Sequence, residues 1–285
     1  MSANPLDAIV GRLGELPALP QTAAAVLRST DDPMCDASTV AQAIEQDPAL
    51  AAKILQVSNS PYYGMRQFVG TLKLALVVVG VREVRNIVTG VAVFDALAAP
   101  GGAALMTGLW EHSMRVGGVA RQLGTRLQAG VPGEAFLAGL LHDIGKLALA
   151  RHDAPAYVGM AGAHGEALCN AERESFGFTH AEAGAALAEH WHFPLPLVDA
   201  IRYHHVADGA PLAAARDPAL AAIVRIANLA ARAALTVDGD TSPACADDEA
   251  WGVLANCADH GETNDRAAVL KSISTGPNTA PGEER

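Results

Sequence analysis

Leu140–Leu149 has the sequence LLHDIGKLAL, which sets His142 and Asp143 side by side inside a strongly apolar run. Burying an ionised carboxylate without a partner is costly, so such a pair needs compensating hydrogen bonds or a metal ion. Imidazole and carboxylate together are a common ligand set for a divalent transition metal. The stretch therefore favours a metal site, with a hydrogen-bonded core pair as the alternative.

Four further histidines, His112, His180, His204 and His205, lie in segments with helical patterns. Metal ligands in helical bundles come from facing helices. Taken singly, His112 could be an ordinary core histidine. His204 and His205 could be surface residues at a helix end, where imidazolium complements the helix dipole. Together with the His142-Asp143 pair, they predict a site assembled from four helices.

The order of these residues resembles the ligand pattern of the HD-domain metallophosphohydrolases, and most nearly that of the HD-GYP phosphodiesterases. It consists of His112, His142-Asp143 followed by Lys146, His180 in the string HAEAG, and the His204-His205 pair. The sequence departs from that pattern at two places. Asn228 stands where HD-GYP enzymes have a late aspartate, and positions 206–211, VADGAP, lack the Gly-Tyr-Pro loop.

The first hundred residues are similar to the N-terminal half of the HDOD family, the HD-related output domain of bacterial signalling proteins. The similar strings are LPALP at 16–20, QDPAL at 46–50, VSNSPYYG at 57–64 and the segment 75–86. This resemblance extends from Leu16 to Ala234. It implies a regulatory module, because most HDOD proteins are regarded as non-catalytic.

The resemblance also implies roles for the site residues. His112, His142, Asp143 and Asn228 would surround one metal ion, and Asp143, His180, His204 and His205 a second. Asn228 weakens the first set, because an amide oxygen is a neutral and poorer donor. We expect one or two ions, iron or manganese. Asp143 and Lys146 would be catalytic only in an enzyme, where Lys146 would hold a substrate phosphate; otherwise Lys146 would pair with a carboxylate.

Composition limits the remaining classes of function. The chain has 285 residues, half of them hydrophobic, and a net charge of −11. It shows no apolar run long enough to span a membrane and no signal peptide, so we expect a cytoplasmic protein that does not bind membranes. It shows no basic patch, which disfavours direct nucleic-acid binding. The cysteines form no Cys-x-x-Cys pair, which argues against a zinc ribbon.

Apolar spacing predicts an all-α fold, in which a helical N-terminal subdomain packs on an HD-type helical bundle. Asp47 and Pro48 predict the start of one helix, and Pro61 limits its end. Asn59 is expected to be a structural turn residue, and with Asp47 and Tyr62 to lie near the interface between the subdomains. Further helices are expected near 104–129, 134–150, 154–175, 180–192, 195–205 and 216–236.

The segment Pro100-Gly101-Gly102 predicts a linker. We therefore expect an N-terminal HDOD subdomain at 1–100, an HD-like subdomain at 101–238 and an acidic, partly disordered tail at 239–285. Residues 236–285 contain ten acids and three bases. One short helix is expected in the tail around Trp251. His152, His164, His190, His192 and His260 match no ligand position.

Two hypotheses of function follow. The first is a non-catalytic signalling module that acts through ligands or through protein partners of two-component or cyclic di-GMP pathways. The second is a metal-dependent phosphohydrolase acting on a nucleotide or cyclic dinucleotide. Asn228, the missing loop and the N-terminal half favour the first, while the nearly complete ligand set supports the second. Fold resemblance does not decide between them.

Overall fold

The computed structural model describes positions 37–63, 65, 67–98, 103–129, 132–160, 162–205, 212–233, 248–257, 266–271 and 273, with isolated positions between 9 and 26. Every regular element in these ranges is a helix, which confirms the predicted all-α fold. The first half contains α3 (Ala37–Glu45), α4 (Pro48–Ser58), the 3-10 turn η1 (Pro61–Tyr63), α5 (Leu72–Val78) and α6 (Val81–Leu97).

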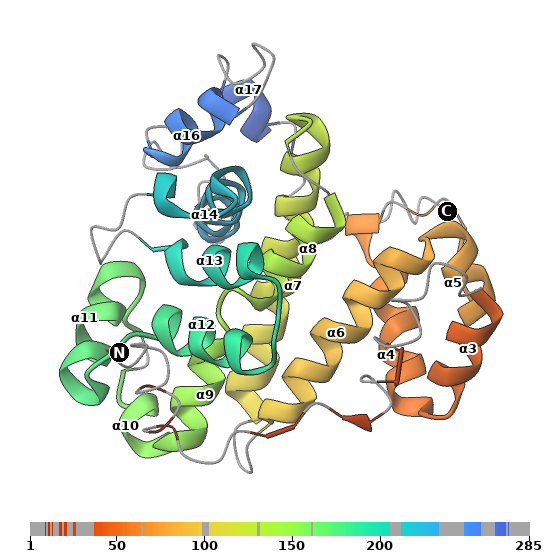
Figure 1. Cartoon of the computed structure of the whole chain (residues 1–285), viewed down its shortest axis with the longest axis horizontal. Coiled ribbons are helices and arrows are strands. Elements are labelled where there is room, and N and C mark those ends of the chain that lie inside the picture. Colours follow the sequence, from red (N-terminus) through yellow and green to blue (C-terminus); the bar gives the residue numbers. More distant parts are fainter. Residues whose placement is uncertain are drawn as a thin grey trace, which may run out of the picture.

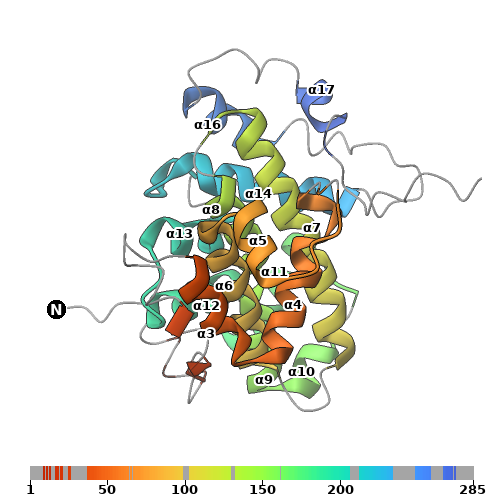
Figure 2. The same ribbon diagram turned by 90° about the vertical axis from the view of Figure 1, so that its right-hand side faces the viewer.

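The second half contains the remaining helices, which range from long helices to short single turns. They are α7 (Ala103–Arg126), α8 (Pro132–Leu141), α9 (Ile144–His152), α10 (Ala154–Val158), α11 (Gly165–Phe176), α12 (His180–His190), α13 (Leu195–Tyr203), the 3-10 turn η2 (Leu212–Ala214), α14 (Pro218–Ala233), α16 (Ala250–Cys257) and α17 (Arg266–Lys271). Figures 1 and 2 show α3, α4 and α5 gathered on one side, with α6 and α7 between them and the remaining helices.

Helix α4 begins and ends where the sequence predicts. The Asp47 side chain accepts hydrogen bonds from the backbone N–H groups of Ala49 and Leu50, and Pro48 is the first helical residue. This arrangement satisfies donors that a helix N-terminus leaves free. After the helix, the Asn59 amide donates to the carbonyls of Leu55 and Val69 and accepts from the Val69 N–H. Asn59 therefore has the predicted structural role, and these contacts lie within the first half.

Residues of η1 and α7 join the two halves. A Cβ at Gly118 would lie 2.0 Å from the Tyr62 ring, so glycine permits the close approach of η1 to α7. The Arg121 guanidinium lies 4.7 Å from the centre of the Tyr63 ring, a cation–π contact, and donates to the Tyr62 carbonyl. The Tyr63 ring also meets Phe136 of α8 edge to face, with 5.4 Å between ring centres. One continuous core therefore extends through both halves.

Two predicted helices are wrong in their extent. The helix expected at 134–150 breaks at His142 and Asp143, where α8 ends and α9 begins. Tight packing accompanies this bend, because a Cβ at Gly145 would lie 1.8 Å from the carbonyl oxygen of His180 at the start of α12. The helix expected at 154–175 is divided into α10 and α11.

The C-terminal segment contributes more to the core than expected. The predicted short helix around Trp251 is present as α16, and Trp251 is fully buried. The Arg225 guanidinium on α14 donates two hydrogen bonds, of 2.7 and 2.9 Å, to the Asp248 carboxylate. A second short helix, α17, brings Val269 and Leu270 into the core. These described parts of the expected tail belong to the folded unit.

Several predictions concern residues outside the described ranges. These are the linker at 100–102, the segment 206–211 and His260. Among the helices that the structure describes, none is both long and apolar enough to cross a membrane.

Candidate metal centre

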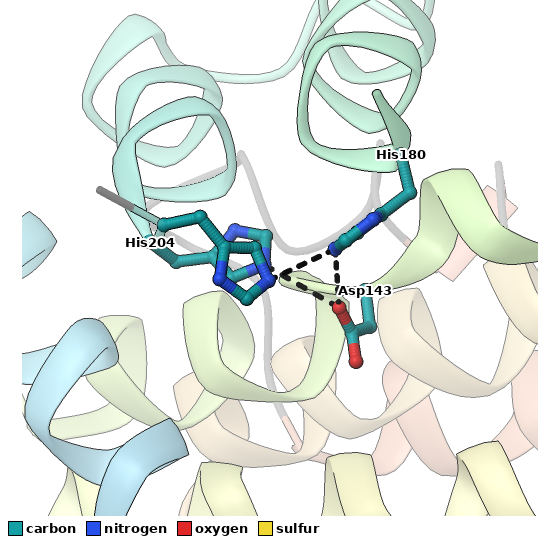
Figure 3. Close-up of side chains that lie close together, drawn as sticks. Asp143, His180 and His204 are labelled. Carbon is teal, nitrogen blue, oxygen red and sulfur yellow. Dashed lines mark hydrogen bonds and ion pairs between the residues drawn. The ribbon is translucent and has the colours of Figure 1, made fainter. Parts of the chain in front are cut away.

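The predicted ligand residues of this centre come from four regions of the chain. His112 lies in α7, His142 and Asp143 lie in the bend between α8 and α9, and His180 is the first residue of α12. His204 follows the last residue of α13, with His205 next to it. Figure 3 shows the side chains of Asp143, His180 and His204 converging. The structure thus brings together six residues that the sequence separates by up to 93 positions.

The Asp143 carboxylate is fully buried at the middle of this group, and its two oxygens face different partners. Oδ1 lies 3.1 Å from His180 Nε2 and 3.4 Å from His204 Nε2. Oδ2 lies 3.2 Å from His142 Nε2, 3.6 Å from His112 Nε2 and 2.6 Å from Lys146 Nζ. Two clusters of possible ligands therefore share one carboxylate. We call Asp143, His180, His204 and His205 the open cluster, and His112, His142 and Asp143 the closed cluster.

Outer hydrogen bonds set the orientation of three imidazoles. His142 Nδ1 lies 2.7 Å from the Gly139 carbonyl oxygen, and His204 Nδ1 lies 2.6 Å from that of Ile201. His180 Nδ1 lies 2.7 Å from Glu172 Oε2. Since these acceptors take a hydrogen from Nδ1, each Nε2 remains to face Asp143. Histidines that bind metals in proteins show the same arrangement.

Three buried atoms at the centre lack a hydrogen-bond partner in the part of the chain that the structure describes. They are His142 Nε2, His204 Nε2 and Asp143 Oδ1. Unpaired buried polar atoms are rare, and an ion is one recognised explanation. Imidazole nitrogen and carboxylate oxygen suit a divalent transition metal. The residues present therefore fit the ion that the ligand pattern implies.

Glu172 of α11 is a residue of this centre that sequence reasoning missed. Its carboxylate is fully buried and accepts hydrogen bonds from the backbone N–H and Nδ1 of His180. The Tyr157 hydroxyl donates to the other oxygen over 3.2 Å. One signal could have revealed it: Glu172 falls on the apolar face of α11, with Leu168, Cys169 and Phe176. An acid on such a face needs a buried partner.

The position of Asn228 on α14 distinguishes the closed cluster. Asn228 Oδ1 lies 3.1 Å from Arg232 Nε and 3.1 Å from His112 Nε2. A guanidinium nitrogen only donates, so the Asn228 atom that faces it is the acceptor oxygen. His112 Nε2 must then carry a hydrogen and donate as well. In this arrangement His112 Nε2 is engaged in a hydrogen bond and has no free lone pair for an ion.

The ionisation of the centre follows from burial and from neighbouring charges. Burial lowers the pKa of both His112 and His204 to about 3, and burial also lowers the pKa of His205. Burial would raise the pKa of Asp143, but His142 and Lys146 outweigh this effect and hold it well below its usual range. Burial would lower the pKa of His180, but its hydrogen bonds to Asp143 and Glu172 outweigh this effect and raise it. At neutral pH His112, His204 and His205 are therefore neutral, as metal binding requires of imidazole ligands, whereas an ion has to compete with a proton at His180.

Lys146 is buried and forms an ion pair with Asp143 three residues earlier. This contact is one of the two roles that the sequence suggested for Lys146. The four histidines His152, His164, His190 and His192 are exposed and take no part in either cluster.

Comparison with known proteins identifies relatives in sequence and in structure. A curated relative from Treponema pallidum (strain Nichols), itself uncharacterised, is 26% identical over 242 residues; the match covers 82% of this chain and 45% of that protein. The chain thus spans less than half the length of that relative.

Two solved structures are similar over most of their length. One, from Shewanella amazonensis SB2B, is provisionally named a phosphohydrolase; it has a TM-score of 0.68 and 28% identity, and the match covers 94% of each chain. The other is an HDOD domain protein of unknown function from Geobacter sulfurreducens, with a TM-score of 0.73 and 24% identity, and the match covers 94% of this chain and 92% of that one. The family model described as HDOD domain matches residues 16–207. The chain therefore belongs to the HDOD domain family.

Proposed function

We propose that this protein is an HDOD signalling module that holds one divalent transition metal ion, iron or manganese, in the open cluster. It acts by binding a protein or ligand and not by hydrolysis. Membership of the HDOD family supports the regulatory role. One observation carries the single-ion proposal: Asp143 Oδ1, which faces the open cluster, is unpaired, whereas Asp143 Oδ2, which faces the closed cluster, is paired with Lys146. The closed cluster also has His112 bonded to Asn228.

Fixed positive charges disfavour an ion in the closed cluster. Lys146 Nζ is in contact with Asp143 Oδ2, the oxygen that faces this cluster. The Arg232 guanidinium bonds the Asn228 oxygen beside His112. A dication there would have to compete with Lys146 for Oδ2 and separate His112 from Asn228. Like charges at such distances repel strongly in a buried setting.

No lysine or arginine of the described residues bonds Asp143 Oδ1 or a histidine of the open cluster. Within that cluster His205 Nε2 lies 3.1 Å from His180 Nε2, a contact that an ion between them would replace. The four members of the open cluster offer three imidazoles and one carboxylate oxygen within 4.8 Å of one another. Glu172 accepts a hydrogen bond from His180 Nδ1, and a carboxylate in this position raises the basicity of a metal-binding imidazole. A bound ion would supply Lewis acidity at this position. The residues that hold it are Asp143, His180, His204 and His205.

The alternative function is a metal-dependent phosphohydrolase acting on a nucleotide or cyclic dinucleotide. The nearly complete ligand set supports it, as does the similarity to the Shewanella protein named for that activity. In two-metal hydrolysis the pair of ions stabilises both the attacking and the leaving oxygen, and a single ion activates the attacking water less strongly. We therefore expect cyclic di-GMP hydrolysis to be absent or very slow. Under the first proposal, the partners are regulators of two-component or cyclic di-GMP pathways.

Metal analysis tests the single-ion proposal. Protein purified without a His-tag and loaded anaerobically with Fe(II) or Mn(II) should retain about one equivalent. His180→Ala should lose most of it, while His112→Ala should keep it, since His112 lies outside the open cluster. His164→Ala is the control, because His164 is exposed and belongs to neither cluster. Metal content below about a tenth of an equivalent after loading would refute the proposal.

A hydrolysis assay separates the two functions. The metal-loaded protein is incubated with cyclic di-GMP, and the products are separated and quantified. Turnover near about one per second, abolished by Asp143→Ala, would establish the enzyme and overturn the non-catalytic module. Absence of turnover by protein shown to contain its metal supports the module.

A further inference from the structure

A cavity lies apart from the metal centre, at the seam between the two halves. It has a volume of about 760 Å³ and is lined by residues of α4, η1, α6 and α7. Sites for small molecules in proteins have volumes of roughly 300 to 1,000 Å³. None of the residues that line this seam cavity belongs to the open or the closed cluster.

Helix α7 separates the cavity from the metal centre. Thr107, Trp110, Glu111 and Met114 line the cavity and recur at intervals of three and four residues, so they share one face of the helix. His112 is two residues from Trp110, which places it about 200° further round an ideal helix. The two sites therefore lie against different faces of the same helix.

The interior of the seam cavity is apolar and aromatic. Val57, Val91, Phe94 and Met114 are buried and line it. Trp110 is only half-buried and meets Phe94 edge to face, with 5.0 Å between ring centres. Thioether and aromatic side chains adapt well to a flat ring, through sulfur–aromatic and ring–ring contacts. This lining suits a planar aromatic group.

Polar groups of the seam cavity differ in how far they are already paired. Lys53 forms an ion pair with Asp95, and both side chains are about half exposed. Arg115 is half-buried and lies beside the Tyr62 hydroxyl, and no carboxylate of the described residues forms a salt bridge with it. Glu111, one turn before Arg115, is exposed. Arg115 is therefore the cation available to a ligand.

Ser60 supplies a further polar group. Its hydroxyl oxygen is buried and has no hydrogen-bond partner among the residues described, although Ser60 lines the seam cavity. A buried hydroxyl without a hydrogen-bond partner destabilises the protein, and a hydrogen bond to a ligand atom would remove this penalty. Apolar walls with a few unpaired polar groups are typical of small-molecule sites.

We propose that the seam cavity binds a small planar aromatic anion. Its ring packs on Trp110, Phe94 and Met114, and its carboxylate, sulfonate or phosphate group pairs with Arg115. Ser60 adds a hydrogen bond. This site is independent of the metal and of the proposed single-ion centre.

Two fluorescent probes of nearly equal shape test the proposal. 8-Anilinonaphthalene-1-sulfonate is an aromatic anion, and N-phenyl-1-naphthylamine is its neutral counterpart. We expect saturable binding of the sulfonate at about one site per chain. Arg115→Met should weaken sulfonate binding about tenfold and change binding of the neutral probe by less than about twofold, because only the charge-assisted contact is lost.

A second pair of variants tests the location. Thr107→Phe places a ring in the seam cavity from an exposed position, so it should weaken binding of both probes about tenfold or more. Ala104→Phe is the matched control, on the same helix and exposed but outside the lining, and should change neither. The melting temperature of each variant shows that it is folded.

Three outcomes would overturn the proposal. One is sulfonate binding that Thr107→Phe leaves unchanged. Another is equal loss of both probes in Arg115→Met, which would remove the role of charge. The third is loss of binding in Val77→Gln, since Val77 belongs to an exposed apolar surface with Phe68 and Val78 and would then be the true site.

Discussion

Replacement of Glu172 by glutamine should weaken metal binding while leaving the fold nearly intact. Glu172 accepts from the His180 N–H at 2.8 Å and from His180 Nδ1 at 2.7 Å, and its other oxygen accepts from Tyr157. A glutamine can keep the first two bonds through its amide oxygen. Its NH2 group then faces the Tyr157 hydroxyl, which can rotate to accept. The hydrogen-bond count is preserved, and the loss is one negative charge behind His180.

The expected size of this effect follows from that loss. Mutation of the outer partner of a metal-binding histidine costs about 10- to 100-fold in metal affinity, or about 1.4 to 2.8 kcal/mol. The free energy of unfolding of the metal-free protein should fall by only about 1 kcal/mol, the difference between a charged and a neutral acceptor. Glu172→Ala should cost several times more, because it leaves buried donors unpaired.

Titration with Mn(II), with the free ion followed by electron paramagnetic resonance, measures the affinity. Glu174→Gln is the matched control, since Glu174 is exposed on the same helix. Equal Mn(II) affinity in Glu172→Gln and Glu174→Gln would refute the reasoning, because His180 would then not be a ligand oriented by Glu172.

Further predictions concern packing and charge. Gly145→Ala should lower the free energy of unfolding, measured by denaturant titration, by about 3 kcal/mol or more, since the new Cβ meets backbone atoms of α12. Gly252→Ala is the control and should not destabilise the protein, because a Cβ at Gly252 has nothing within 4 Å. Trp251→Ala should cost about 3 to 5 kcal/mol in the same assay because Trp251 is fully buried; an unchanged midpoint would show that α16 contributes nothing to the core. The double variant Asn228→Asp with Arg232→Gln should raise the metal content, measured by elemental analysis, from about one towards two equivalents. The double substitution adds a negative charge to the closed cluster and removes a positive one. An unchanged metal content would contradict the assigned role of Arg232.

Local sequence determined the helical fold, the family and the identity of the converging side chains. Apolar spacing and capping residues act over a few positions, so the start of α4 at Asp47 and Pro48 was predictable. The order of His112, His142-Asp143, His180 and His204-His205 resembled a known ligand pattern, and all of these residues meet in the structure. Their roles as metal ligands remain predictions that metal analysis will test.

The extent of the helices around the centre depended on contacts between distant segments. The apolar run at 140–149 is compatible with one continuous helix. Gly145 packs against His180 at the start of α12, 35 positions further along the chain. The spacing of apolar residues around Gly145 does not reveal this contact. The same limit applies to α16, because its burial against α14 depends on long-range packing and on the Arg225–Asp248 pair.

The difference between the open and closed clusters is a property of the tertiary structure. Sequence showed that Asn228 replaces a carboxylate, which by itself only weakens a ligand. The fold places Arg232 and His112 on the same amide oxygen, and Glu172 behind His180. His112 is 116 residues from Asn228 and Glu172 is 8 residues from His180, whereas Arg232 is only four residues from Asn228 on the same helix. The sequence specifies which titratable side chains are available. Which ring nitrogen of each histidine carries a hydrogen, and which residue pairs with each charge, are decided only when folding excludes water and brings the segments into contact.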